Sequence, residues 1–206
     1  MFASTITSII VFATFATFPP IIFAGSTPTS SGEFKCTPQK SHTTYPNQCR
    51  ILEIFNYLAN GSDEAFFAQV APDVDWTVMG THPLAGEYHN RTIFIADTLE
   101  RLANTEDPSN PLTLSVTNII GGGNEEWSVQ ELHVLGSCKN GLVFDNRYAW
   151  ATRWNTEGVI VQARAYLDSA LVATAITENE SVEHHYYDQR TSLMDGPIGL
   201  NCVAPS

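Results

Sequence analysis

Apolar residues recur at helical spacing in three segments of the first half of the chain. In 49–61 they stand every three or four positions, at Ile51, Ile54, Phe55 and Leu58, and Asn60-Gly61 ends the pattern. A second helix is expected from the Ser62 cap and its acidic first turn to the residue before Pro72. A third is expected over 89–104, after a short strand at 73–80.

The second half of the chain has the pattern of strands. Four longer strands are predicted, at 111–120, 125–136, 141–154 and 158–172. Short turn signals such as Gly121-Gly-Gly-Asn124 separate them, so they should form an antiparallel meander. The order helix, helix, strand, helix and four strands predicts an α+β fold, in which three N-terminal helices and a curved antiparallel sheet enclose a cone-shaped cavity.

Alternation along the last two strands indicates which side chains face that cavity. On the last strand the apolar set should point inward and the polar set outward, so Asp168 is expected to pair with Arg164 on the outer face. On the preceding strand the inward set is Asn146, Tyr148, Trp150, Thr152 and Trp154. The outer face of the sheet is then the expected surface for a homodimer, if one forms.

The two ends of the chain differ from this domain. Residues 1–24 are apolar without a charged side chain, which is typical of a signal peptide; a membrane anchor is the alternative, but Pro19-Pro20 shortens any helix there. We interpret 25–47 as a Ser/Thr/Pro-rich arm, 48–175 as the folded domain and 176–206 as a polar tail. The protein should therefore be secreted or lie in the secretory-pathway lumen, with no stable membrane insertion after cleavage.

Other features of the chain fit secretion. Four cysteines, Cys36, Cys49, Cys138 and Cys202, allow two disulfides in three connectivities. Sequons begin at Asn60, Asn90 and Asn179, so these are candidate glycosylation sites. No cysteine or histidine spacing suggests a metal site. A net charge of −12 with ten Lys and Arg argues against nucleic-acid binding and favours a neutral or apolar small molecule as partner.

Three stretches carry a resemblance to a known family: VAPDVDWTVMGTHPLAGEYHNR (70–91), DNRYAWATRW (145–154) and EGVIVQARAYLDS (157–169). With the order of elements, they resemble the SnoaL-like branch of the nuclear transport factor 2 superfamily. That branch includes polyketide cyclases, ketosteroid isomerase, scytalone dehydratase and limonene epoxide hydrolase. The resemblance implies the cone-shaped fold, but this fold carries many different chemistries.

The sequence departs from this family at its usual acidic positions. Relatives often read RDYxD on the last strand, where the first Asp is an inward acid or base, and Ala165 stands at that position here. The base, the oxyanion-hole Asp and the Tyr of ketosteroid isomerase correspond to about Val78, Trp150 and Ile54 or Phe55. The chain therefore lacks the residues that both the RDYxD relatives and ketosteroid isomerase use, and neither mechanism can be transferred to it unchanged.

Polar residues at other expected inward positions are the remaining candidates. Epoxide hydrolases of this fold place an Arg and an Asp at positions that resemble Glu131 and His133, which suggests an acid/base pair; a histidine on a solvated face is the alternative. Tyr148 and Asn146 are expected to polarise a carbonyl or hydroxyl group. The residues expected to contact substrate are Trp76, His82, Trp150, Ala163 and Ala165.

Two functional hypotheses follow from the sequence. The first is a cyclase, isomerase or dehydratase without a cofactor, acting on a hydrophobic polyketide- or terpenoid-like molecule of secondary metabolism. The loss of the strong inward acid suits a reaction that needs mainly orientation, such as ring closure. The second is a secreted protein that binds a small molecule in the same cavity without turnover, and Ala165 favours this alternative.

Overall fold

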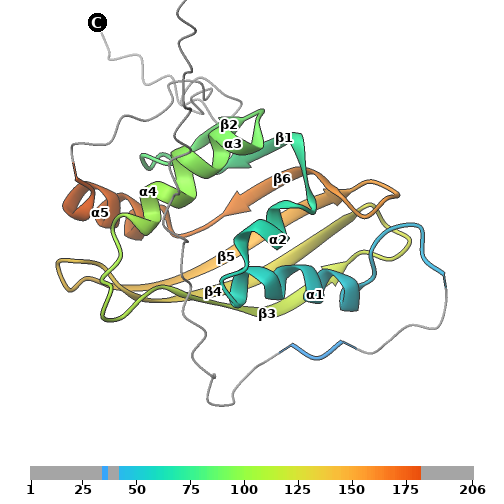
Figure 1. The fold of residues 1–206 in the computed structure, drawn as a ribbon, viewed down its shortest axis with the longest axis horizontal. Helices are drawn as coiled ribbons and strands as arrows, with labels where there is room; N and C mark the ends of the chain where they lie inside the picture. Colours follow the sequence, from blue (N-terminus) through green and yellow to red (C-terminus); the bar gives the residue numbers. More distant parts are fainter. Residues whose placement is uncertain (1–33, 37–41, 182–206) are drawn as a thin grey trace, which may run out of the picture.

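The computed structural model describes residues 34–36 and 42–181 (Figure 1). The predicted signal peptide, most of the arm and the tail from residue 182 lie outside these ranges. Within them, no helix is both long enough and apolar enough to span a membrane.

Three helical segments precede the meander, as predicted. Helix α1 (Gln48–Ala59) is capped by Asn47, whose side chain accepts a hydrogen bond from the backbone N–H of Arg50. Helix α2 (Asp63–Phe67) is shorter than predicted because strand β1 already begins at Val70. The third segment is continuous but changes its geometry: α3 (Arg91–Phe94), a π-helical stretch (Ile95–Leu99) and α4 (Glu100–Ala103) follow one another.

A six-stranded sheet forms the second layer. Its strands are β1 (Val70–Val78), β2 (Gly86–Tyr88), β3 (Thr113–Gly121), β4 (Trp127–Ser137), β5 (Val143–Trp154) and β6 (Ile160–Tyr166). Their order is β2-β1-β6-β5-β4-β3. The predicted antiparallel meander of β3 to β6 is confirmed. Strand β1 joins β6 in parallel, with Trp76 opposite Ala163, and the short β2 extends the sheet beyond β1.

The last predicted strand is wrong at its end. Strand β6 stops at Tyr166, and helix α5 (Ser169–Asn179) follows. Asp168 is the N-cap of α5, because its carboxylate accepts from the backbone N–H groups of Ala170 and Leu171 at 3.0 and 3.1 Å. The expected Asp168–Arg164 ion pair is therefore also wrong. The Arg164 guanidinium lies over the Trp127 ring instead, 5.1 Å from its centroid.

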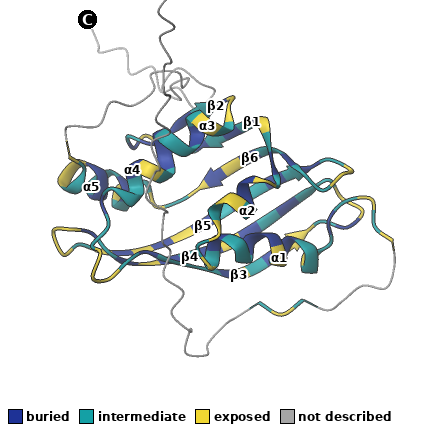
Figure 2. Ribbon diagram, in the orientation of Figure 1, coloured by how far each residue is buried: buried dark blue, intermediate teal, exposed yellow. Residues whose placement is uncertain are grey.

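The buried residues lie between the helices and one face of the sheet. Helices α1 to α4 are on the same side of the sheet in Figure 1, and the dark-blue residues of Figure 2 concentrate between the two layers. The apolar face of α1 is buried there, as the sequence predicts. The opposite face of the sheet keeps exposed apolar side chains, at Leu135, Val143 and Tyr166.

One of the predicted disulfides is present. It joins Cys36 in the arm to Cys49 in α1. Cys138 is a free, buried thiol, and Cys202 lies outside the described residues. Of the sequon asparagines, Asn60 and Asn90 are exposed and Asn179 is half-buried.

Candidate functional site: an apolar cavity between helices and sheet

A cavity lies where β1, β5 and β6 face the π-helical segment and α5. Its lining is mainly apolar: Trp76, Val78, His82, Leu84, Phe94, Thr98, Leu99, Leu102, Tyr148, Trp150, Ala165, Leu167 and Val172. Its volume is about 40 Å³, room for about two or three water molecules. Admission of a larger substrate therefore requires the lining side chains or α5 to move.

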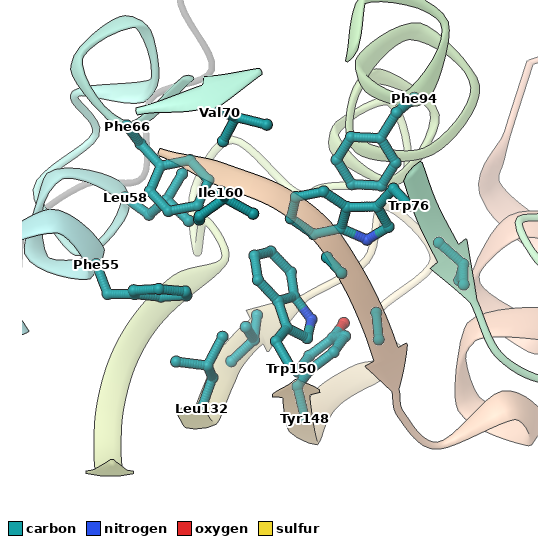
Figure 3. Packing of buried hydrophobic residues seen from close by; sticks show 14 of the residues in the cluster. Phe55, Leu58, Phe66, Val70, Trp76, Phe94, Leu132, Tyr148, Trp150 and Ile160 are labelled. Atoms are coloured by element: carbon teal, nitrogen blue, oxygen red, sulfur yellow. The ribbon is translucent and has the colours of Figure 1, made fainter. Parts of the chain in front are cut away.

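Aromatic rings form the wall of the cavity on the sheet side (Figure 3). Trp76 stacks on Phe94 with ring centroids 4.1 Å apart, and Trp150 meets Trp76 edge to face at 5.1 Å. Tyr148 lies next to Trp150 on the same strand face, with centroids 6.4 Å apart. The inward facing predicted for β5 is thus confirmed. Ala163 and Ala165 are buried on β6, and Ala165 lines the cavity.

Polar atoms on this wall are few and mostly unpaired. The indole Nε1 of Trp76, the indole Nε1 of Trp150 and the amide Nδ2 of Asn146 are buried without a hydrogen-bond partner among the described residues. The Asn146 side chain has a fixed orientation, since its Oδ1 accepts from the backbone N–H of Asp168 at 3.1 Å. Burial raises the pKa of Tyr148 far above its ordinary value, and the nearby Asn146 amide offsets part of that rise. Tyr148 therefore remains a neutral phenol at physiological pH.

His82 lines the cavity, as predicted, and is 5 % exposed. The backbone N–H of Leu84 donates to its Nδ1 at 3.3 Å, and its Nε2 lies 3.1 Å from the carbonyl oxygen of Met79. These two contacts fit the neutral tautomer with the proton on Nε2. Gly80 permits this turn, because it has a φ of +119° and a Cβ there would lie 2.3 Å from Ser169 Oγ at the start of α5.

Of the two alternatives left open for β4, the structure supports the histidine on a solvated face. Its even-numbered residues from Ser128 to Gly136 are buried, so Glu131 and His133 lie on the outer face of the sheet, away from the cavity. His133 Nε2 lies 2.8 Å from Asp145 Oδ1, and Arg147 pairs with the same carboxylate. The pKa of Asp145 is lowered first by Arg147 and then by His133. The structure thus makes His133 part of an outer-face ion cluster and does not bring it to the cavity residues.

The inner face of β4 begins with two polar residues, Ser128 and Gln130, before the apolar Leu132 and Val134. Ser128 Oγ accepts hydrogen bonds from Gln130 Nε2 at 2.6 Å and from Trp154 Nε1 at 2.7 Å, and it lies 3.1 Å from Thr152 Oγ1. This network satisfies the buried polar groups across two strands, so Ser128 and Gln130 can face the helices.

Sequence reasoning missed a group of polar residues on the helical side. Asp97 and Thr98 are 2 % and 4 % exposed, and both belong to the π-helical segment. π-Helical turns occur frequently at functional sites. Nearby, Arg101 on α4 donates two hydrogen bonds to Glu180 at the end of α5, and one to the carbonyl of Pro83 beside His82. The sequence gives no signal for such burial, because a polar residue on an amphipathic helix is expected to face solvent. The burial of Arg101 becomes evident only when the position of α5 against α4 is known.

Among the described residues, no three His, Cys, Asp or Glu side chains are placed to hold a metal ion.

Comparison with known proteins identifies sequence relatives and fold relatives. The chain is 33 % identical over 161 residues to a fungal protein named dimerizing cyclase phiC, covering 76 % of this chain and 69 % of phiC. It is 29 % identical over 182 residues to dimerizing cyclase tstC of Talaromyces stipitatus, covering 86 % of this chain and 78 % of tstC. No family model matches the chain.

The fold has a counterpart among solved structures. A crystal structure of an NTF2-like protein from Burkholderia thailandensis superposes with a TM-score of 0.52 at 24 % identity, over 61 % of this chain and 93 % of that protein. This similarity confirms the expected nuclear transport factor 2-like fold.

Proposed function

Since the chain belongs to the same family as the fungal dimerizing cyclase phiC, we propose that it closes a ring on a hydrophobic, polyketide- or terpenoid-like small molecule, without a cofactor. The relative tstC carries the same name, which supports a cyclase rather than the non-catalytic binding protein. The word "dimerizing" in both names further suggests that two substrate units are joined during the reaction.

The apolar cavity with its aromatic wall is the observation that carries this proposal. Apolar walls such as Trp76 and Trp150 hold a flexible substrate in a folded conformation, and such orientation is itself a large part of the rate gain in a ring closure. Tyr148 supplies a neutral phenol O–H that can hold or donate a proton. His82 supplies a buried imidazole to the cavity lining, in the loop before Leu84.

Secretion, glycosylation and a homodimer are further parts of the proposal. The Cys36–Cys49 disulfide suits an oxidising compartment, and the sequon asparagines Asn60 and Asn90 are exposed. The outer face of the sheet, with Leu135, Val143 and Tyr166 exposed, is the surface that we propose for the homodimer.

The cyclase proposal is tested by product formation. The genes on either side of its own gene are first searched for a polyketide or terpene synthase. The chain is then expressed in a host together with that synthase, and metabolites are compared with and without the chain. We expect a cyclised product that depends on the chain and falls at least tenfold with Tyr148→Phe or His82→Gln. The outer-face control His133→Gln should form the cyclised product in the same amount as the original chain. An identical metabolite profile with and without the chain would contradict a cyclase and favour a binding protein.

A further inference from the structure

Two buried tryptophans of the cavity wall each carry an indole N–H without a hydrogen-bond partner among the described residues. Trp76 and Trp150 are 0 % and 6 % exposed, and neither indole N–H has a partner in the described part of the chain. The contrast is Trp154 on the same face of β5, whose N–H donates to Ser128 Oγ at 2.7 Å. Burial of an N–H without a partner is costly, so buried tryptophans usually find one. The missing partners at Trp76 and Trp150 therefore need an explanation.

The two donors belong to one site. Their rings meet edge to face at 5.1 Å, and both line the cavity with Tyr148. Figure 3 shows the two indole nitrogens and the Tyr148 oxygen turned toward the same space between β1 and β5. Neighbouring rings restrict these positions, since Trp76 stacks on Phe94 and Trp150 also packs against Phe55. The two indoles are thus restrained by packing before any ligand arrives, so the movement that admits a ligand falls to α5 and the other lining side chains, and this restraint limits the entropy lost on binding.

The chemistry of these groups defines the ligand that they fit. An indole N–H can donate and cannot accept, and the neutral Tyr148 hydroxyl adds a third potential donor. Two indole donors in an apolar cavity match an oxygen that carries lone pairs and no proton. A carbonyl oxygen, or the enolate oxygen formed from it, has this character, whereas a hydrocarbon or an ammonium group has not.

We infer that Trp76 and Trp150 form a binding site for a carbonyl oxygen, so that the substrate class is an apolar ketone or acyl compound. This inference rests on the proposed function only in calling the bound molecule a substrate. The two indole N–H groups would orient and polarise the bound C=O by hydrogen bonding.

The test uses two probes of nearly the same shape. Acetophenone carries a C=O group where α-methylstyrene carries C=CH₂. Their dissociation constants are measured for the full chain and for Trp76→Phe/Trp150→Phe, which keeps aromatic rings and removes both N–H groups. We expect the double variant to bind acetophenone about tenfold more weakly and α-methylstyrene within about twofold of the original chain. The control Trp127→Phe, on the outer face, should change neither.

Indole NMR signals of the unaltered chain provide a second readout that does not depend on folding of the variants. Acetophenone should move the Hε1 signals of Trp76 and Trp150 downfield, while those of Trp127 and Trp154 stay in place. α-Methylstyrene should not produce these downfield shifts. Three results would overturn the inference. The double variant could lose affinity equally for both probes, both probes could shift the Hε1 signals equally, or acetophenone could fail to bind up to its solubility limit.

Failure of this inference is distinguishable from failure of the proposed function. Selective acetophenone binding without any cyclised product in the host assay would leave the carbonyl site standing and remove the cyclase. A chain-dependent cyclised product without selectivity between the probes would remove the carbonyl site alone.

Discussion

The backbone N–H of Asp168 donates a hydrogen bond to Asn146 Oδ1 at 3.1 Å and thereby joins the start of α5 to the cavity face of β5. The Asp168 carboxylate caps the same helix, whose residue Val172 lines the cavity. In a sequence, a carboxylate at the end of a strand suggests acid/base chemistry. Here the carboxylate of Asp168 positions helix α5, which contributes Val172 to the site.

Removal of this cap should lower stability. Asp168→Ala deletes the acceptor of the Ala170 and Leu171 N–H groups, so we expect the free energy of unfolding to fall by about 1 kcal/mol. Asp168→Asn retains a capping oxygen and should lose only a fraction of that. Urea denaturation of both variants checks the prediction. An equal loss in both would indicate that the charge of Asp168, rather than its capping bonds, matters.

The Arg101–Glu180 ion pair should matter more than an exposed ion pair. The side chains of Arg101 and Glu180 are 10 % and 12 % exposed, and Glu180→Gln would remove the carboxylate that accepts two hydrogen bonds from the buried guanidinium. We expect a loss of about 3 kcal/mol in unfolding free energy. The matched control is Glu53→Gln in the exposed Arg50–Glu53 pair, which should cost less than about 0.5 kcal/mol. Chemical denaturation decides between them, and similar losses at both sites would contradict a buried linkage.

The stability of the protein should carry a pH dependence from Asp63. Its Oδ1 is buried without a partner in the described residues, and burial raises its pKa from 3.8 to about 6. The folded state therefore holds this proton more tightly than the unfolded state. Its contribution to the unfolding free energy falls as pH rises from about 4 to 6 and stays low above that.

Asp63→Asn should remove this contribution. The variant is expected to gain stability relative to the original chain between about pH 4 and 6, as measured by urea denaturation at a series of pH values. Asp107→Asn is a control of opposite sign. The pKa of Asp107 is lowered by hydrogen bonds from Ser109, so its removal should cost stability above its titration range. A constant difference between Asp63→Asn and the original chain across this range would show that the Asp63 carboxyl is solvated.

Substitution of the outer-face pair should leave catalysis intact. Glu131→Gln and His133→Ala lie on the far side of the sheet from the cavity, so product yield in the host assay should stay within about twofold of the original. Any change is expected in self-association, which light scattering measures. A large loss of product in a folded variant, with the association state unchanged, would restore the acid/base hypothesis for these two residues.

The contrast between β4 and β5 explains how far the sequence predicts the site. On β5, the charged residues Asp145, Arg147 and Arg153 alternate with a set that contains the aromatic residues. The sequence pattern alone therefore indicates that the charged set faces solvent and the aromatic set is buried. On β4 the apolar Trp127 and Val129 alternate with residues such as Ser128 that are buried only because another strand supplies their hydrogen bonds. That information is non-local and is missing from the pattern of one strand.

The order of the three N-terminal helical segments, β1 and the β3–β6 meander was predictable because each depends mainly on local spacing, whereas β2 and α5 were not predicted. The start of α5 also has a local signal, since Asp168 is followed by the apolar, helix-compatible SALVATAI, but the alternation of β6 continues into it and obscures the boundary. The unpaired indole donors were not predictable. Alternation indicates that Trp76 and Trp150 point inward, and only the packed structure shows what their N–H groups meet.

The parallel pairing of β1 with β6 has a consequence for synthesis of the chain. Asp75 on β1 and Gln162 on β6 are hydrogen-bonded partners 87 positions apart. As β1 leaves the ribosome, its principal neighbour has not yet been made, and the short β2 offers it three residues of pairing. Strand β1 must therefore wait, with its β6-facing edge unpaired, until translation has delivered β6. Chaperone demand for this protein should consequently be set by the time needed to translate those intervening residues.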